Sequence, residues 1–570
     1  MLRHPHLCGT LSGLPSSRAH RDRVAATAAA DRGIAHPNAA GSKCGSAHRP
    51  HGETRGGGSP RHFNLGTSMT ALRPLVALIS ALAAAQIAML SAGSAQTSSG
   101  YATEARNGPL PAPRRLALQG DAERARNADG RGLSQEHRPP PIDAVNAGAL
   151  CAASPDRDEA ACLQRALDAA CAGSNARGGN VVYLPPGTYT IASTVTVHCD
   201  GVRIVGAGIG HRDSAQRGTA LRCSVTSGPC IRFAKRGSKN YSYGGGIEHL
   251  SFVNPVEQGS GTAVSLQVEH AQNFHAQNLY FWAPFQAIKV IAGAHNTFYA
   301  IHMEAILPGG TGIEVTGAFA GGSIEASQAT RNDTTTFQDI FMSAGGVVTP
   351  SAKHPTCLAI RDFAATTVVR SLQCLNPHDG VVISCAPGAT IDACPAFMDF
   401  RDLEIDFAHG RNLVASDFQS LKCFGCYFHG SESTIENVAL FNRHYNASWS
   451  AQFIGGKADG AIGTCFASQV GATVVQGMDI HNCNRGGAGA AGLTLFGPRP
   501  DAEDATGNNV IVGNTFCRFR GAAPTRMGAI TIRPGVEATT VVANVFADCA
   551  AGVAGAGPEA NHQVGLNAGP

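Results

Sequence analysis

Short β-prone runs separated by sharp corners follow one another through most of this sequence. The clearest example reads VVYLPPGTYTI, in which Val181–Leu184 and Thr188–Ile191 flank a Pro-Pro-Gly corner. Proline presets φ at the second position of a β-turn, and glycine tolerates the positive φ of the third. A third run, Thr194–Val197, follows, and the pattern restarts at Val202–Val205. Three strands and three corners in about 21 residues are typical of one coil of a β-solenoid.

The same unit returns further along the chain in altered form. The hexapeptides LSFVNP, LYFWAP and LQCLNP begin at Leu250, Leu279 and Leu372, and a second run follows at a fixed offset in Pro284–Val290 and Pro377–Ile383. One coil cannot bury its apolar face alone, so neighbouring coils must stack into a continuous core. The rival fold, an antiparallel sandwich, predicts hairpin dipeptides and strict alternation. The regularly phased corners favour the solenoid.

Two further patterns refine this prediction. Asn514 and Asn544 occupy equivalent places in GNTF and ANVF, 30 residues apart, so we expect them to stack as an asparagine ladder at a corner. Asp158–Cys171 has apolar residues at helical spacing and acidic residues in its first turn. We expect this one short helix to cap the N-terminal end of the solenoid, because an open end exposes strand edges.

The quoted VVYLPPGTYTI run, followed by a strand and the VGAG of Val205–Gly208, resembles the first coils of the pectate lyase superfamily. More narrowly, it resembles the rhamnogalacturonase/epimerase-like pectate lyase domain. The resemblance is pronounced over Gly178–Gly210 and diffuse as far as about Gly552. It implies an all-β chain folded as a single-stranded right-handed parallel β-helix, the pectin lyase fold, with the short N-terminal capping helix.

The N-terminal part of the chain is typical of a leader. Arg73 precedes an apolar core at Leu75–Leu90, and the small residues Gly93–Ala95 offer a cleavage site, as in a secretory signal peptide. A lone membrane anchor is the alternative, but the apolar run is short for a span. We therefore predict a secreted or periplasmic protein. The predicted parts are a disordered upstream extension at 1–68, a signal peptide at 69–95, a disordered linker at 96–149 and the β-helix at 150–560.

Charge and cysteine content agree with export. Residues 1–95 contain 10 of the 44 Lys and Arg but only 3 of the 41 Asp and Glu, so the rest of the chain has a net charge near −4. Nothing there suggests a nucleic-acid surface. Sixteen of the 18 cysteines lie from Cys151 onward, which predicts disulfides in an exported chain. Cys223/Cys230 and Cys385/Cys394 are candidate small loops, and Cys423/Cys426 is interpreted as a structural pair or as two ordinary thiols rather than a redox motif.

The superfamily resemblance implies action on polysaccharides in a groove along one face. Hydrolases of this kind need two or three carboxylates, whose separation decides inversion or retention. Lyases and epimerases instead need a base and a cation that stabilises an enolate. The polygalacturonase-like set of Asn-x-Asp, Asp-Asp, Gly-His-Gly and Arg-x-Lys is absent, apart from one Asn-x-Asp in the linker. That catalytic set therefore cannot be carried over.

Two stretches are candidate sites. Asn376–Asp379, NPHD, resembles the Asp-Pro-His-Asp motif of alginate C5-epimerases, with Asn376 in place of the first Asp. The resemblance implies proton transfer by His378 and an orienting role for Asp379, although a plain coil corner is the alternative.

In MDFRDLEIDFAHG, Asp402, Glu404 and Asp406 alternate with apolar residues. On a strand these three carboxylates would share one outward face, about 6.5–7 Å apart, which approaches the spacing of inverting glycosidases. A solvated acidic strand face is the alternative.

The leading prediction is an exported carbohydrate-active β-helix protein that binds, and cleaves or modifies, a polysaccharide as a lyase, glycoside hydrolase or epimerase. The alternative is a non-catalytic surface or matrix-binding scaffold or adhesin, which the missing hydrolase signature favours. Polysaccharide is the expected partner, with no nucleic acid and no membrane span in the mature chain. The sequence requires no cofactor and leaves calcium open at the acidic strand. Oligomeric state stays open.

Overall fold

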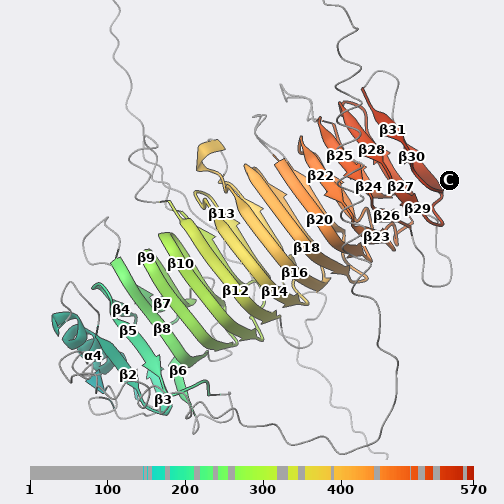
Figure 1. Ribbon diagram of the computed structural model, residues 1–570. Coiled ribbons are helices and arrows are strands. Elements are labelled where there is room, and N and C mark those ends of the chain that lie inside the picture. Colours follow the sequence, from blue (N-terminus) through green and yellow to red (C-terminus); the bar gives the residue numbers. More distant parts are fainter. Residues whose placement is uncertain are drawn as a thin grey trace, which may run out of the picture. The chain divides into compact units, whose positions relative to one another are not determined.

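A computed structural model gives the architecture of the C-terminal three quarters of the chain (Figure 1). The predicted upstream extension, signal peptide and nearly all of the predicted linker lie outside the described residues. The structure describes residues 145–569 apart from 147–150, 152–156, 174–179, 211–217, 235–241, 255–262, 318–330, 345–353, 387–390, 442–449, 488–489, 498–506, 518–526 and 556–560.

The described chain forms one continuous parallel ladder, which confirms the right-handed parallel β-helix (Figure 1). Each strand pairs in parallel with the equivalent strand of the preceding and following coils, as in the series β10, β12, β14, β16, β18 and β20. The ladder runs from β1 to β31, slightly beyond both predicted ends of the domain.

The elements have the following bounds. The first half contains β1 (Val145–Asn146), α4 (Ala160–Gly173), β2 (Val181–Leu184), β3 (Gly187–Ile191), β4 (Val195–Val197), β5 (Arg203–Gly206), β6 (Thr219–Cys223), β7 (Gly228–Phe233), β8 (Ser242–Val253), β9 (Ala263–Trp282), β10 (Gln286–Glu304), β11 (Thr311–Thr316), β12 (Asp333–Ser343), β13 (Thr356–Arg361), β14 (Thr367–Leu375) and β15 (Val381–Ser384). The second half contains η3 (Ile391–Ala393), β16 (Met398–Ala408), β17 (Arg411–Ser416), β18 (Ser420–Gly430), β19 (Glu436–Phe441), β20 (Ser450–Asp459), β21 (Phe466–Ser468), β22 (Thr473–Gln476), β23 (Asp479–His481), β24 (Ala491–Leu495), β25 (Asn509–Val512), β26 (Thr515–Phe516), β27 (Gly528–Ile532), β28 (Thr539–Val542), β29 (Val545–Phe546), β30 (Ala551–Ala554) and β31 (Gln563–Gly565).

The longer strands turn a corner without ending, because one residue adopts a left-handed conformation. Asp402 has a φ of 53° in the middle of β16. Ala300, Asp339 and Ser371 hold the equivalent place in the preceding coils with φ of 53°, 55° and 53°, and Gly425 follows with 65°. A single left-handed residue redirects the backbone, and only glycine adopts it without steric cost. One corner of the β-helix is therefore a stack of such residues.

Inward-facing side chains stack from coil to coil to make the core. Phe252 and Phe281 lie parallel with ring centroids 4.8 Å apart, and Phe298 and Phe337 stack at 4.9 Å. All four rings are fully buried. The core is thus the continuous apolar column that the repeat predicts.

The predicted asparagine ladder is confirmed and is longer than predicted. Asn514 Nδ2 donates to Asn544 Oδ1 at 3.0 Å, and Asn544 Nδ2 donates to Asn567 Oδ1 at 3.1 Å. The side-chain oxygens of Asn544 and Asn567 also accept from the backbone N–H of the preceding coil. The ladder therefore satisfies buried polar groups at a corner, where no strand partner is available.

The described chain contains eight disulfides. They include the two candidate small loops, and they show that Cys423 and Cys426 form a structural pair, one of the two alternatives left open. The bridges are Cys151–Cys162, Cys171–Cys199, Cys223–Cys230, Cys357–Cys374, Cys385–Cys394, Cys423–Cys426, Cys465–Cys483 and Cys517–Cys549. Such density is typical of proteins that fold in an oxidising compartment.

The N-terminal helix α4 lies against the first coil, as the sequence predicts (Figure 1). Gln164 on α4 accepts from the backbone N–H of Thr196 at 2.8 Å and donates to its carbonyl at 2.9 Å, so it completes the exposed edge of β4. Two disulfides, Cys151–Cys162 and Cys171–Cys199, fasten the helix. In the part of the chain that the structure describes, no helix is both long and apolar enough to cross a membrane.

Candidate functional site

Two rows of outward-facing polar side chains cross four consecutive coils. The buried residues Ile405, Phe428, Ala458 and Ile480 lie between the rows and point into the core, so both rows point away from it. Paired positions on parallel strands lie about 4.8 Å apart. We call the eight residues of the two rows the polar ladder. In strand register across β16, β18, β20 and β23, one row is Glu404, Tyr427, Lys457 and Asp479, and the other is Asp406, His429, Asp459 and His481.

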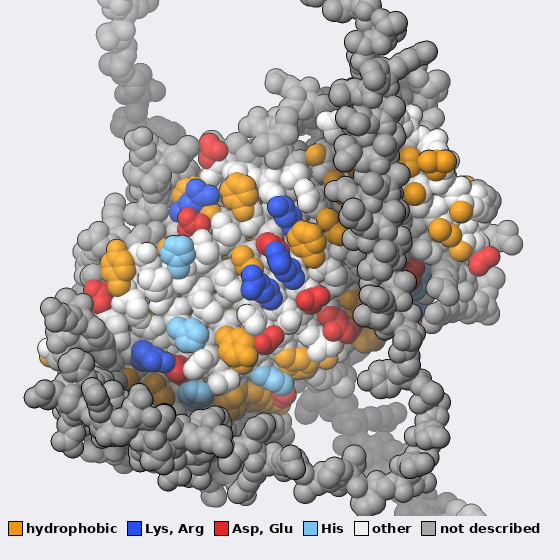
Figure 2. All heavy atoms as spheres, viewed as in Figure 1, with side chains coloured by type: hydrophobic (Ala, Val, Ile, Leu, Met, Phe, Trp, Pro, Cys, Tyr) orange, Lys and Arg blue, Asp and Glu red, His pale blue; other side chains and the backbone are white. Residues whose placement is uncertain are grey.

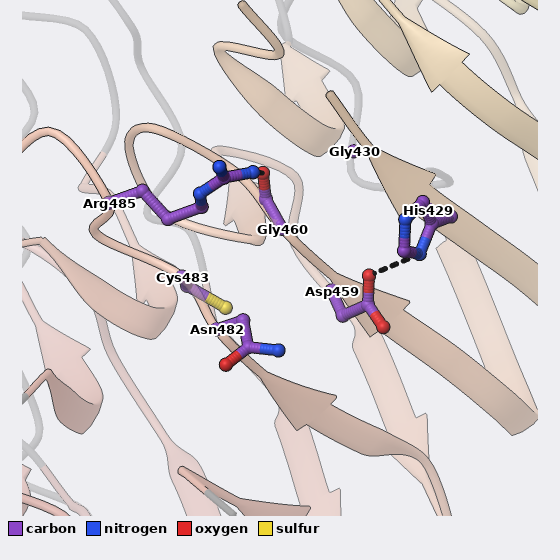
Figure 3. A pocket seen from close by; sticks show the side chains of 7 residues that line it. All are labelled: His429, Gly430, Asp459, Gly460, Asn482, Cys483 and Arg485. Atoms are coloured by element: carbon purple, nitrogen blue, oxygen red, sulfur yellow. Dashed lines mark hydrogen bonds and ion pairs between the residues drawn. The ribbon is translucent and has the colours of Figure 1, made fainter. Parts of the chain in front are cut away.

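Asp459 is the centre of the polar ladder. Its side chain is only 4% exposed, and His429 Nδ1 lies 2.7 Å from its Oδ1 (Figure 3). Lys457 Nζ and His481 Nε2 lie 2.5 Å and 3.3 Å from its Oδ2. Burial alone would raise the pKa of Asp459, but the hydrogen bonds from His429, His481 and Lys457 outweigh it and hold this pKa well below its usual range. Asp459 is therefore a fixed negative charge.

His429 is the ladder's accessible imidazole, with a third of its side chain exposed. The hydrogen bond to Asp459 raises the pKa of His429 against the opposing effect of burial, and the charge of Asp406 adds to the rise. The hydroxyl of Tyr427 lies 3.5 Å from His429 Nδ1, and Lys457 Nζ lies 5.2 Å from the centre of the Tyr427 ring. An imidazole, a phenol and an ammonium group thus lie side by side.

Asp406 lies beside His429 on the preceding coil. Burial, repulsion from Glu404 and a hydrogen bond with Glu404 together raise the pKa of Asp406 to about 6, although His429 opposes the shift. Near pH 6 this carboxyl therefore carries a proton about half of the time. The pKa values of Asp406 and Asp459 are thus shifted in opposite directions, a pattern that is typical of groups with different acid–base roles.

A pocket of about 160 Å³ opens at the end of the second row (Figure 3). Arg485 borders it, with Nη1 at 3.4 Å from the carbonyl oxygens of Ser431 and Gly460. The lining residues are His429, Gly430, Asp459, Gly460, Asn482, Cys483 and Arg485.

A larger, open hollow of about 410 Å³ lies over β12, β14 and β16. Its volume falls within the range of about 300–1,000 Å³ that is usual for ligand sites. Its lining combines carboxylate, amide and hydroxyl groups with one aromatic ring, from Asp339, Ile340, Phe341, Ser371, Leu372, Gln373, Asp402 and Glu404. Figure 2 shows that acidic, basic and histidine side chains lie beside exposed hydrophobic ones on the face of the β-helix in view.

The structure separates the three carboxylates of the predicted acidic strand. Glu404 and Asp406 share the outward face of β16, as the alternation predicts. Asp402 does not, because it occupies the left-handed corner, and there it lines the larger hollow together with Glu404. The expected equal spacing of three acids on one straight strand is therefore wrong for Asp402.

The other two predicted site residues are His378 and Asp379. They lie after β14, beyond the next corner, and belong to neither row of the polar ladder. His378 Nδ1 is 3.2 Å from Asp379 Oδ2, so the two side chains do contact each other. Asp379 Oδ1 also accepts from the backbone N–H of Arg411 at 2.8 Å. Asp379 thus connects two coils, which is the role expected of a corner residue.

Most of the polar ladder was not predicted from the sequence. The missed residues are Tyr427, His429, Lys457, Asp459, Asp479 and His481. They occur as polar–apolar–polar triplets, YFH, KAD and DIH, at one phase of the repeat. Aligning successive coils would have placed these triplets above one another beside LEID.

The described residues contain one group of side chains close enough together to hold a metal ion, namely Cys151, Glu159 and Cys162. The two sulfurs are joined in a disulfide and cannot act as thiolate ligands. This group does not fit calcium either, because calcium prefers oxygen ligands.

Comparisons with known proteins agree with the fold. Residues 152–228 match the family described as Rhamnogalacturonase A/epimerase, pectate lyase-like. No curated protein gives a significant match. Among solved structures, tailspike protein 3 of bacteriophage CBA120 has a TM-score of 0.51 at 12% identity, over 75% of this chain and 62% of that chain.

Two enzymes give lower scores over most of their length. The A-module of mannuronan C-5 epimerase AlgE6 from Azotobacter vinelandii has a TM-score of 0.47 at 17% identity, over 75% of this chain and 99% of its own. DFA-IIIase from Arthrobacter chlorophenolicus scores 0.45 at 12% identity, over 70% and 93%. At these identities the likenesses bear on the fold alone.

Proposed function

We propose that this β-helix chain, whose residues 152–228 match the pectate lyase-like family, is exported. We further propose that it cleaves or modifies a polysaccharide by proton transfer at the polar ladder. The observation that carries the proposal is the exposed imidazole of His429 held at 2.7 Å by the buried carboxylate of Asp459. A buried acid that orients a histidine fixes its tautomer and ring position, which is what a proton-transfer group requires.

The remaining groups favour abstraction of a proton beside a sugar carboxylate. His429, in its neutral form, accepts the proton, and Asp459 stabilises the imidazolium that results. The phenol of Tyr427 lies on the same face, 3.5 Å from His429 Nδ1, and would donate a proton to the leaving oxygen or to the carbanion. Elimination of the glycosidic oxygen then gives a lyase product, and return of a proton to the other face of the carbon gives an epimer.

Cations are available for the acidic group of the substrate. Abstraction of this proton builds negative charge on the sugar carboxylate, which nearby cations stabilise. Lys457 lies in the ladder, and Arg485 borders the adjoining pocket of about 160 Å³. A uronate-containing polysaccharide is therefore the proposed substrate class.

A second candidate is glycoside hydrolysis, which the protonation of Asp406 near pH 6 favours. Asp406 would donate a proton to the leaving oxygen. The opposing base is harder to assign, because Asp459 is buried and ion-paired, and Glu404 shares a hydrogen bond with Asp406.

The test incubates the purified protein with a panel of uronate-containing and neutral polysaccharides. Ultraviolet absorbance reports unsaturated uronates, a reducing-end assay reports cleavage, and NMR reports epimerisation. Absorbance with new ends indicates a lyase, new ends alone indicate a hydrolase, and an NMR change alone indicates an epimerase. Silence in all three assays would overturn the proposal in favour of a binding scaffold.

Substitution assigns the activity to the polar ladder. His429→Gln is expected to lower kcat by about 10²–10⁴-fold, which is the usual contribution of a general acid or base. His198→Gln is the matched control, because His198 also lies beside an aspartate, Asp168 at 3.6 Å, but next to the cap helix. Equal loss in both variants would remove His429 from the mechanism.

A further inference from the structure

Phe407 has a conformation that packing does not explain. It has a φ of 59°, and 44% of its surface is exposed. The register of β16 against β18 pairs Asp406 with His429 and Ala408 with Gly430, so Phe407 is the extra residue of a β-bulge. A bulky residue in the left-handed region is strained, and an exposed ring buries little apolar surface in return.

At the same corner, neighbouring coils have residues that are better suited to a positive φ. The equivalent position in the preceding coil is Asn376, with a φ of 55°, and two coils before that Ala305, which directly follows β10, has the same φ. Asparagine tolerates this conformation, and alanine is small. The fold therefore does not require an aromatic residue here. Bulges are common beside active sites, where they re-aim a side chain.

The Phe407 ring lies against the polar ladder. Its centroid is 4.9 Å from that of His429, and the two rings are nearly perpendicular at 81°. Asp406, the preceding residue, belongs to the second row. An exposed apolar ring thus adjoins the imidazole to which the proton transfer is assigned, and it directly follows the Asp406 carboxyl.

We propose that Phe407 is a stacking platform that binds the apolar face of a pyranose ring and holds the reacting sugar against His429. The axial C–H groups of a sugar ring present a weakly positive apolar face, which complements the negative face of an aromatic ring. The inference rests on the proposed function, and it adds the subsite that positions the sugar. A single ring offers too little area for a protein partner.

The test replaces Phe407 with Asn, the residue of the preceding coil, and with Tyr, which keeps a ring. Binding of uronate oligosaccharides is measured by titration calorimetry in the His429→Gln background, so that nothing is consumed, and kcat and KM are measured with His429 intact. Phe407→Asn is expected to weaken binding about tenfold, the scale of losing one aromatic contact. Phe407→Tyr is expected to restore binding. The thermal midpoint of Phe407→Asn should stay within about 2 °C of the parent, because relief of strain offsets the lost edge contact.

Phe397 is the matched control. It is another phenylalanine at positive φ, 56°, it is 55% exposed, and it lies just before the opposite end of β16. Phe397→Asn should leave binding and kcat/KM unchanged. Unchanged binding in Phe407→Asn, or equal losses in both variants, would overturn the platform while leaving the proposed function intact. Failure of the parent protein to bind or alter any carbohydrate in the panel would overturn both.

Discussion

At the scale of single residues, the polar ladder holds charge in an arrangement that costs stability. Asp406 keeps a proton that an exposed aspartate would release, because it is partly buried next to Glu404. Asp459, one coil beyond His429, has its pKa held well below the usual range by hydrogen bonds from His429, His481 and Lys457. Ionised Asp406 therefore lowers the stability of the fold, whereas ionised Asp459 raises it, and such a conflict is usual where a site is pre-organised.

The pH dependence of stability should reveal Asp406. Its pKa is about 6 in the folded protein, against 3.8 for an unperturbed aspartate. Between these values the folded state binds more protons than the unfolded state, so this residue's contribution falls as pH rises from about 4 to about 6. Asp406→Asn removes the ionisation and should raise the thermal midpoint relative to wild type at pH 8 but not at pH 4. A constant difference at both pH values would contradict the assigned shift.

Removing Asp459 should have the opposite effect. Asp459→Asn leaves His429, Lys457 and His481 without their shared carboxylate, and breaking a buried ion pair costs about 3–5 kcal/mol. Urea unfolding at pH 7 measures this loss. The control Asp168→Asn removes the half-exposed partner of His198 and should cost less than about 1 kcal/mol. In wild type the contribution of Asp459 is present at neutral pH and is lost as pH falls below about 4, because its folded pKa is lowered.

At the scale of elements, the strand of a β-helix is a bent object, and its corners decide which side chains meet. The repeating pattern of the sequence predicts strands, inward-facing residues and the stacking of Asn514 on Asn544. It does so because equivalent residues of successive coils pair with each other. It does not predict that Asp402 lies off the face that Glu404 and Asp406 share. Glycine would indicate a left-handed residue within a strand, but an aspartate there gives no such signal.

The candidate site was harder to predict than the fold for the same reason. Its members are distant in sequence and become neighbours only through register, so LEID was found as a local pattern and His429 and Asp459 were not. The NPHD motif was conspicuous because it is compact, yet Asp379 contacts the backbone of the next coil. A local motif and a functional cluster need not coincide in a solenoid.

The asparagine ladder should be a measurable source of element stability. In Asn544→Ala, the backbone N–H of Asn514 and the carbonyl of Ile511 each lose a hydrogen-bond partner. Leaving such buried groups unsatisfied should cost about 1–3 kcal/mol each. Hydrogen exchange should report faster exchange in β25 to β29, with β16 to β20 unchanged. Uniform acceleration along the ladder would show that this corner is not a local unit.

At the scale of the whole molecule, stability should behave as a sum over coils, since each coil contacts chiefly the coils next to it. The cap helix protects one end and is fastened by Cys171–Cys199. Replacing both of these cysteines with serine should therefore loosen β2 to β5 first, seen as faster hydrogen exchange there, while the activity that we propose for the distant polar ladder persists. Loss of activity at the same rate as loss of protection would indicate that the chain unfolds as one unit.

The parallel register has a consequence for how such a protein can change over generations. Each row of the polar ladder contains one residue from each of four coils. Which residues are neighbours in a row therefore depends on the order of the coils and not on any one segment. Gain or loss of a whole coil near the cap would lengthen or shorten the molecule and leave the row intact. Insertion of a coil between β18 and β20 would leave every strand with a partner on each side and yet separate His429 from Asp459. Heritable variation in coil number should therefore be tolerated at the ends of this molecule and eliminated at its middle.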